Sequence, residues 1–283
     1  MIMLFYKIIK IGTHGNNPML PRDTPNLGQG LPGGSKHYRA FVGLPENYDI
    51  VSSMQFNLLT QMNLRENHSV LDIGCGSLRA GRLLIPYLLP KKYFGLEPEK
   101  WLIDDAIKYE LGQDIIEIKK PVFSYDEDFN FGAFNEKFDY VLAQSIFSHA
   151  PEKTIRKCAI EVEKVMKPDS IFVATFYEGT ENYTGTKWAY PENVYYTFEK
   201  IKKIFEEANL ICRRLDWNSG LQNWILITKP ENKDYSVEFS DFTKQTNMVN
   251  QLNSYKEQLK KIESHPYVKF GLKVRNILNK IRH

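Results

Sequence analysis

Val70-Leu-Asp-Ile-Gly-Cys-Gly-Ser77 is the segment that most clearly indicates the fold. Its first four residues are mostly apolar and predict a short buried strand. Gly74 and Gly76 follow at once, and a turn built on glycines lets the backbone approach a ligand with no Cβ in the way. A strand that runs into such a turn is typical of a site for a nucleotide-like ligand.

A second landmark lies downstream, at Tyr93-Phe-Gly-Leu-Glu97. It predicts another buried strand, and this one ends in an acid. Glu97 lies 25 residues after Asp72, close to the roughly 20-residue offset at which a carboxylate binds a ribose diol. The apolar segment 78–89 predicts an intervening helix that Pro86 kinks or stops early. This order of elements is far more specific than a Gly-x-Gly alone.

Strands and helices alternate along the rest of the chain. We expect strands at 70–73, 93–97, 115–118, 140–144, 171–176, 211–216 and 224–228, and helices at 49–64, 78–89, 100–111, 152–166 and 198–208. Asn218-Ser-Gly220 reads as the loop of a closing hairpin. The pattern predicts an α/β fold: a doubly wound, mostly parallel seven-stranded sheet that ends in an antiparallel hairpin. Such sheets bind ligands at the carboxyl ends of their strands.

Length and composition suit one large domain with appendages. The chain has 283 residues, of which 42% are hydrophobic, enough for a substantial core. We expect an irregular N-terminal arm over 1–44, because 12–37 is rich in Gly, Pro and Asn. The main domain should cover 45–230, and a helical extension should cover 231–283.

Charge and cysteine content exclude several classes of protein. A formal charge of +3 is too small to indicate nucleic-acid binding. Cys75, Cys158 and Cys212 are odd in number and far apart, which fits neither a disulfide framework nor a zinc site and favours a reducing compartment. No segment reaches the roughly 18 apolar residues of a membrane span, and residues 1–11 make a poor secretory signal. We therefore expect a cytoplasmic protein.

The C-terminal extension carries two amphipathic patterns. Apolar residues recur at steps of four and three from Met248 to Ile262, which fits either self-association as a homodimer or packing back onto the domain. Residues 265–283 contain five Lys/Arg and no acid, and their apolar residues share one helical face. This basic end would bind an anionic membrane surface, which would place the protein at the inner face of the membrane. The alternative is that its apolar side packs against the domain.

At this point the motifs resemble those of a known family. Val70 to Gly76 resembles the first motif of the class I S-adenosylmethionine-dependent methyltransferases. Gly95-Leu-Glu-Pro98 is similar to their second motif and Phe138 to Gln144 to their fourth, and the closing hairpin resembles their last two strands. The resemblance covers about residues 45–230. One departure is Leu78, which stands where the first motif commonly has a third glycine.

Three shorter stretches, 77–82, 143–149 and 188–191, resemble a bacterial subgroup associated with modifying surface polysaccharides. The wider resemblance implies a Rossmann-like methyltransferase fold with S-adenosylmethionine as cofactor. The glycines would face its methionine part, Asp72 would order the loop or meet the amino group, and Glu97 would bind the two ribose hydroxyls. The full cofactor-binding set that it implies is Asp72, Gly74, Gly76, Glu97, Asp128, Phe129 and Gln144.

The sequence says less about the acceptor, which is the substrate that would receive the methyl group. A sugar hydroxyl is a weak nucleophile that a positioned base would help, and His149 follows the fourth strand, with an ordinary pKa of about 6.5. The alternative is that His149 caps the next helix or binds a loop carbonyl. Tyr177, Glu178, Trp188 and Tyr190 lie on or after the fifth strand and would wall in the acceptor, although such aromatics often serve as core.

Two arginines and several acids have competing interpretations. Arg79 and Arg82 open the first helix and suit an anionic acceptor, the cofactor carboxylate or a merely exposed helix face. Asp126 and Asp128 have a spacing that fits a cation, but no histidine is near them in sequence. We expect no metal.

The leading hypothesis is methyl transfer from S-adenosylmethionine to a sugar hydroxyl of a bacterial capsule or other surface polysaccharide. N- or O-methylation of a phosphate-type or small-molecule group in the same pathway is the alternative acceptor chemistry. A nicotinamide-dependent dehydrogenase shares the spacing from Asp72 to Glu97, but the missing third glycine and the hairpin argue against it. A non-catalytic cofactor-binding scaffold that recruits partners through 235–283 is the third hypothesis.

Overall fold

A computed structural model describes residues 26–217, 222–239 and 254–256. The chain divides into two units, one over 20–238 and one made of 1–19 and 239–283. In the second unit the described residues are Phe239 and the helical residues 254–256. The expected hairpin loop 218–220, the basic segment 265–283 and most of the apolar stripe from Met248 to Ile262 lie outside the described residues.

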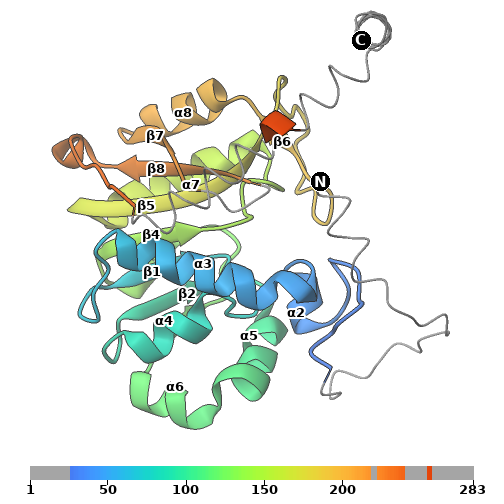
Figure 1. The fold of residues 1–283 in the computed structure, drawn as a ribbon. Coiled ribbons are helices and arrows are strands. Elements are labelled where there is room, and N and C mark those ends of the chain that lie inside the picture. The colour runs from blue at the N-terminus through green and yellow to red at the C-terminus, as the bar shows by residue number, and fades with distance from the viewer. Residues whose placement is uncertain (1–25, 218–221, 240–253, 257–283) are drawn as a thin grey trace, which may run out of the picture. The chain divides into compact units, whose positions relative to one another are not determined.

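The first unit is built on a mixed sheet with the strand order β3-β2-β1-β4-β5-β8-β7, and β6 pairs with β5 (Figure 1). β1 to β5 run parallel to one another, whereas β8 is antiparallel to both β5 and β7. The predicted mostly parallel sheet with a closing antiparallel pair is therefore confirmed. The strands are β1 Val70–Ile73, β2 Tyr93–Leu96, β3 Val122–Ser124, β4 Phe138–Ala143, β5 Met166–Glu178, β6 Tyr195–Tyr196, β7 Ile211–Leu215 and β8 Asn223–Thr228.

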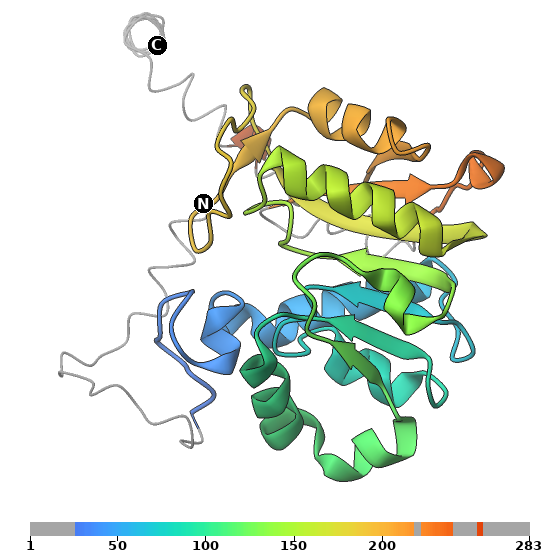
Figure 2. The same ribbon diagram turned by 180° about the vertical axis from the view of Figure 1, so that it is seen from behind.

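Helices cover both faces of this sheet. α3 and α4 lie over one face (Figure 1), and α7 and α8 lie over the other (Figure 2). The α-helices are α2 Tyr38–Phe41, α3 Tyr48–Gln61, α4 Gly81–Tyr87, α5 Lys100–Ala106, α6 Gln113–Lys119, α7 Glu152–Val165 and α8 Phe198–Glu206. The single-turn elements are η1 Pro45–Asn47, the π-turn η2 Ile107–Leu111, η3 Phe131–Phe134 and η4 Pro230–Asn232.

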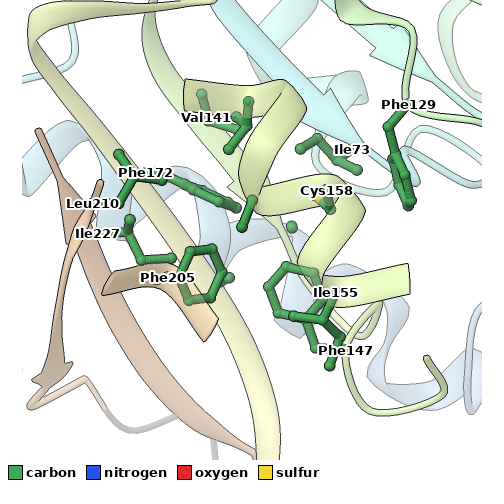
Figure 3. Close-up of a cluster of buried hydrophobic side chains, with 14 of the residues drawn as sticks. Ile73, Phe129, Val141, Phe147, Ile155, Cys158, Phe172, Phe205, Leu210 and Ile227 are labelled. Atoms are coloured by element: carbon green, nitrogen blue, oxygen red, sulfur yellow. The ribbon is translucent and has the colours of Figure 1, made fainter. Parts of the chain in front are cut away.

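The hydrophobic core lies between the sheet and the pair α7 and α8 (Figure 3). Phe205 of α8 packs against Phe172 of β5 and Phe147, with ring centroids 5.9 and 5.8 Å apart. Ile155 and Cys158 of α7 are fully buried beside them. Burying side chains of this size contributes roughly 1.5–3 kcal/mol each, which fixes the α7 layer and with it the loop that precedes α7.

One strand prediction is wrong. Residues 115–118 belong to helix α6, and the strand comes later, as β3. The run of isoleucines suggested a strand because β-branched residues are common in strands. Gly112, with φ +82°, and Lys120, in the left-handed region, bound the helix instead. The expected irregular arm also differs, since Tyr38–Phe41 forms a short helix whose N-cap is the His37 side chain.

Leu78 shows how the motif does without its third glycine. This residue is fully buried and adopts φ +55°, a conformation that costs an ordinary side chain roughly 1 kcal/mol or more. Close packing of helix on strand is provided by Gly81 instead, because a Cβ there would lie 2.7 Å from the Tyr93 hydroxyl. The left-handed residue at 78 also explains why α4 begins at Gly81 and not at Leu78 as predicted. It ends at Tyr87, directly after Pro86, as Pro86 indicated.

Candidate functional site

A cavity of about 560 Å³ opens at the carboxyl ends of β1, β2 and β4. This is the point where the strand order reverses, since β2 and β3 lie on one side of β1 and β4 and β5 on the other. The structure brings most of the predicted residues together here. Those that line the cavity are Asp72, Gly74, Gly76, Glu97, Phe129, Gln144, His149, Trp188 and Tyr190.

The glycine turn after β1 forms the floor of the cavity. Gly74 and Gly76 adopt φ +64° and +54°, which favours glycine at both positions. A Cβ at Gly76 would lie 2.7 Å from Val42 Cγ1, and one at Gly74 would collide with Ile146. Any side chain at either position would therefore displace Val42 or Ile146, which both line the cavity.

Glu97 follows β2 and is only 9% exposed. Its two carboxylate oxygens accept hydrogen bonds from the backbone N–H groups of Gly76 and Glu99, each at 2.9 Å. These bonds orient the carboxylate beside the glycine turn. Burial raises the pKa of Glu97 to about 7, although the two N–H donors oppose the shift. A ligand that donates two hydroxyl groups would stabilise the ionised form.

Asp72 lies one strand away and is also buried. Its Oδ2 accepts a hydrogen bond from the Tyr93 hydroxyl at 2.7 Å, which fixes the carboxyl group. Burial raises the pKa of Asp72 to about 6, with the hydrogen bond from Tyr93 and the charge of Arg79 acting in the other direction. The cavity thus has two acids whose ionisation a bound cation or donor would favour.

His149 lies in the loop between β4 and α7, with 9% of its surface exposed. Its Nδ1 lies 2.7 Å from the backbone oxygen of Glu192. A carbonyl oxygen only accepts, so Nδ1 carries the hydrogen, and Nε2 of the neutral ring keeps its lone pair. Burial lowers the pKa of His149, and the bond to Glu192 partly offsets this. The ring is held as a neutral base at neutral pH.

The structure distinguishes the two structural roles considered for His149, which were capping the next helix and binding a loop carbonyl. Helix α7 has Pro151 as its N-cap and no side-chain cap hydrogen bond, so the expected capping role is wrong. The loop-carbonyl role is present, but it uses only one ring nitrogen. Backbone bonds from Ala189 N to His149 O (2.9 Å) and from Val194 N to Ser148 O (2.8 Å) hold the loop against the segment that follows β5.

Aromatic side chains wall the cavity next to His149. The ring of Tyr190 meets that of His149 edge-on at 5.0 Å, and Trp188 lies 6.1 Å away. Phe41, from helix α2, packs on Tyr190 at 5.2 Å and accepts the Tyr190 hydroxyl hydrogen bond with its backbone oxygen. An acceptor at His149 would therefore meet mainly apolar ring faces.

Three predicted site residues lie outside the cavity lining. Tyr177 stacks on Tyr195 of β6 with centroids 5.6 Å apart. Glu178 forms an ion pair with Arg214 of β7. One partner belongs to β6, which pairs with β5, and the other to β7, which β8 separates from β5; neither Tyr177 nor Glu178 is part of the cavity lining. Asp128 is 80% exposed and pairs with Lys157, so Phe129 alone of that predicted pair lines the cavity.

Sequence reasoning missed several lining residues because they arrive from segments far apart in the chain. Gln55 is the one with a visible signal: it is a polar residue on the buried face of α3, between Ser52 and Leu58. Its Oε1 is buried with no hydrogen-bond partner among the described residues. The lining residues that were not predicted are Phe41, Val42, Gln55, Ile73, Cys75, Ala80, Leu96, Pro98, Glu99, Leu102, Glu127, Ser145, Ile146 and Thr154.

The segment that carries Phe41 and Val42 is held by a buried charge cluster. Glu110, on the π-turn η2, accepts hydrogen bonds from the Tyr38 hydroxyl (2.8 Å) and Arg39 Nε (2.6 Å). Arg82 Nη1 binds its other oxygen at 2.9 Å. The side chains of Arg39 and Glu110 are 5% and 8% exposed. Tyr48 lies under both guanidinium groups and donates to the backbone oxygen of Ser77 in the glycine turn.

Glu110→Gln is expected to lower the free energy of unfolding by about 3 kcal/mol, because it removes the buried one of the two carboxylates that balance the charges of Arg39 and Arg82. Chemical denaturation followed by circular dichroism measures this. Asp49→Asn is the matched control: Asp49 pairs with the same two arginines but is 55% exposed, so its loss should cost less than about 1 kcal/mol. Equal losses in the two variants would contradict the assignment of Glu110 as the anchor of this segment.

The described residues contain neither a cluster of metal-binding side chains nor a helix that could span a membrane. In the ranges 26–217, 222–239 and 254–256, no three His, Cys, Asp or Glu side chains are grouped so as to hold a metal ion. Within the same ranges, no helix combines the length and hydrophobicity that a membrane span requires.

Comparison with known proteins agrees with this geometry. Residues 71–172 match the family model described as a methyltransferase domain. A curated relative, the sterol 24-C-methyltransferase of Candida albicans (strain SC5314 / ATCC MYA-2876), is 30% identical over 133 residues. That alignment covers 46% of this chain and 33% of the relative, so this chain matches only about a third of that protein's length.

Solved structures resemble this chain at low sequence identity. A glycopeptide N-methyltransferase complexed with S-adenosylmethionine matches with a TM-score of 0.50 and 12% identity, over 64% of this chain and 95% of that one. The magnesium protoporphyrin IX methyltransferase of Synechocystis PCC 6803, solved with bound S-adenosylhomocysteine, has a TM-score of 0.49 and 12% identity, over 65% of this chain and 84% of that one. The match to the glycopeptide N-methyltransferase shows that the described part of the chain has the Rossmann-like methyltransferase fold. The family match shows separately that residues 71–172 are similar to a methyltransferase domain.

Proposed function

We propose that this protein transfers a methyl group from S-adenosylmethionine to a hydroxyl group of a sugar acceptor. The observation that carries this proposal is that one cavity contains both a carboxylate suited to binding ribose hydroxyls and a histidine whose Nε2 keeps its lone pair. Glu97 lies at the carboxyl end of β2, and His149 follows β4. The first feature suits a nucleoside ligand, and the second suits removal of a proton from an acceptor.

The cavity fits S-adenosylmethionine in size and in chemistry. A volume of about 560 Å³ lies within the roughly 300–1,000 Å³ of small-molecule sites. The cavity is lined by the backbone of the glycine turn and by the carboxyl groups of Asp72 and Glu97, which suit a ligand with a nucleoside part and a cationic part. Glu97 would hold the ribose hydroxyls, the glycine turn would face the methionine part, and Phe129 would pack on the adenine.

S-adenosylmethionine supplies an already activated methyl group, so the protein has mainly to align the acceptor and manage one proton. His149 takes the proton that the acceptor hydroxyl loses, through Nε2, while its bond to Glu192 keeps the ring in place. Gln144, at the end of β4, flanks the methionine part. Trp188 and Tyr190 offer ring faces to the acceptor beside His149.

A sugar acceptor is favoured by these walls, because the apolar face of a sugar ring packs well on aromatic rings, leaving a hydroxyl directed at the base. By its resemblance to the polysaccharide-modifying subgroup, the acceptor belongs to a bacterial capsule or another surface polysaccharide. The test compares the methylation of surface polysaccharide, by mass spectrometry, in cells with the gene, without it, and without it but supplied with His149→Ala. A methyl group lost on deletion and restored by the wild-type protein alone is the expected result.

Two outcomes of this experiment overturn the proposal. An unchanged polysaccharide would exclude the sugar acceptor and favour a small-molecule or phosphate-type group. Full methylation with both His149→Ala and Glu97→Ala, each supplied to deletion cells in the same way, would mean that neither residue is needed, and a scaffold that catalyses nothing would then be the better account.

The last part of the proposal rests on sequence alone, since residues 265–283 lie outside the described residues. Their excess of basic residues would bring the protein to the anionic inner face of the membrane. Deleting 265–283 should reduce sedimentation with anionic liposomes, and an unchanged pellet would contradict it. The apolar stripe from Met248 to Ile262 would pair two copies, which sedimentation equilibrium of the full chain and of a chain ending at 238 tests.

A further inference from the structure

Two lysine-bearing turns lie side by side at the amino-terminal edge of the sheet. Pro90-Lys-Lys92 leads from α4 into β2, and Lys119-Lys-Pro121 leads from α6 into β3. The backbone N–H of Lys91 donates to the backbone oxygen of Lys119 at 2.7 Å, which joins the two turns directly. β2 and β3 are neighbouring parallel strands, and Figure 1 shows α6 close to α4. The turns therefore form one surface, the lysine patch, which consists of Lys91, Lys92, Lys119 and Lys120.

The positive charges of the lysine patch are not balanced by nearby acids. Lys92 and Lys119 donate from Nζ to neutral oxygen atoms, at 3.2 and 2.8 Å. Among the described residues, no carboxylate lies within the 4.0 Å of an ion pair from any of the four ammonium groups. Two exposed acids, Glu66 and Glu117, belong to the adjoining segments, but neither pairs with these lysines. The surface therefore keeps an excess of positive charge.

The two exposed lysines occupy unfavourable backbone positions. Lys91 and Lys120 adopt φ +62° and +50°, in the left-handed region that favours glycine and costs an ordinary side chain stability. Within the described part of the chain, neither side chain makes a hydrogen bond or an ion pair. Local stability therefore does not account for lysine at these turns, whereas binding of an anionic partner does.

Aliphatic side chains are exposed beside both turns. Leu89 directly precedes the first turn and is 47% exposed, while Ile118 and Val122 flank the second turn and are 60% and 38% exposed. No residue of α6 or β3 is buried. A single exposed aliphatic residue is ordinary, but three of them around four unpaired lysines make a surface that is both basic and apolar.

This combination favours a lipid surface over a soluble polyanion. A nucleic acid or an acidic polysaccharide would attract the lysines but would gain little from exposed leucine, isoleucine and valine. An anionic membrane offers charged headgroups to the lysines and, beneath them, hydrocarbon to the aliphatic side chains. Both halves of the surface therefore have a partner in the same structure.

We propose that the lysine patch, together with Leu89, Ile118 and Val122, binds the folded domain to the surface of an anionic membrane. This inference goes beyond the proposed function, because it involves neither the methyl donor nor residues 265–283. The patch lies at the amino-terminal edge of the sheet, whereas the cavity opens at the carboxyl ends of the strands. Binding through the patch therefore leaves the cavity edge directed away from the lipid.

The direct test places an environment-sensitive fluorophore on the surface of the full chain. All three native cysteines are buried, so a thiol reagent should label Ile118→Cys selectively. Its emission should shift to the blue with vesicles that contain phosphatidylglycerol and should not shift with phosphatidylcholine vesicles. Ile160→Cys is the matched control, because Ile160 is 46% exposed on α7, which covers the other face of the sheet (Figure 2). The label at 160 should not respond.

Removal of the two exposed charges is an independent arm. In the full chain, Lys91→Gln with Lys120→Gln should weaken binding to the anionic vesicles roughly 10- to 30-fold, since each lysine at the surface contributes about fivefold. Lys36→Gln with Lys153→Gln is the control, because it removes the same net charge from exposed positions outside the patch. Its effect should stay below about threefold. Vesicle sedimentation measures both, and circular dichroism checks that the variants fold.

Four results would overturn the inference. Vesicle binding with no shift at 118 would mean that another part of the chain, such as residues 265–283, makes the contact. Absence of any vesicle binding would exclude the membrane. A blue shift with soluble polyphosphate as large as that with vesicles would assign the patch to an acidic polymer. Equal weakening in the two double variants would indicate unspecific charge attraction. None of these results concerns methyl transfer, which titration of S-adenosylhomocysteine tests separately.

Discussion

Replacing His149 by glutamine should lower kcat for methyl transfer by roughly 10²- to 10⁴-fold, the contribution of a positioned general base. Glutamine can still bind the Glu192 carbonyl, so the loop should keep its position, but it has no basic nitrogen to take the proton. The dissociation constant for S-adenosylhomocysteine should stay within about twofold of wild type, because His149 acts on the acceptor. Rates with labelled S-adenosylmethionine and calorimetry measure the two effects.

His68→Gln is the matched control for this substitution. His68 lies in the loop before β1, where its Nδ1 accepts a hydrogen bond from Arg65 N at 3.0 Å, and it is absent from the cavity lining. Its replacement should leave kcat unchanged. Because burial lowers the pKa of His149, the wild-type rate should fall only when the pH drops below the ordinary histidine range. A His149→Gln enzyme as fast as wild type would contradict the role of His149 as the general base.

Glu97→Ala should weaken binding of S-adenosylhomocysteine by roughly 10²-fold, since two hydrogen bonds to a charged acceptor are lost. Asp128→Asn is the control, because Asp128 is exposed and outside the cavity lining, and its effect should stay below about twofold. Calorimetry of the three proteins makes the comparison. A comparable loss of affinity in Asp128→Asn would show that Asp128 also contributes to binding.

The pH dependence of binding follows from the raised pKa of Glu97, about 7. Below pH 7 the carboxyl group is mostly protonated in the ligand-free protein, and ionising it to accept two hydroxyl donors costs free energy. Wild-type affinity should therefore fall about fivefold between pH 7 and pH 6 and should rise little above pH 8. Glu97→Gln cannot titrate, so its affinity should vary less over this range. An equal pH slope in the two proteins would contradict the role of Glu97.

The sequence predicted best what depends on neighbouring residues. The strand at Val70, the glycine turn and the acid at Glu97 are local patterns, and the parallel sheet brings them to one edge by its topology. The run of isoleucines in α6 was misread because its apolar length and β-branched content do not distinguish a short strand from a helix.

Long-range packing explains what was missed. Phe41 and Val42 reach the cavity because Glu110, about 70 residues later, binds Arg39. Arg79 and Arg82 look alike in sequence, and only the folded chain shows that Asp49 and Glu110 neutralise one of them. Glu178 was expected at the acceptor, but Arg214 on a distant strand binds it elsewhere. None of these pairings has a local signal.

The central claim is that this cavity binds S-adenosylmethionine through the glycine turn and Glu97. Calorimetric titration of S-adenosylhomocysteine into wild-type protein and Glu97→Ala, with NAD⁺ as the competing nucleotide, tests it most directly. We expect one binding site per chain for S-adenosylhomocysteine, marked weakening in the variant and no heat from NAD⁺. Absence of S-adenosylhomocysteine binding, or binding of NAD⁺ in its place, would contradict it.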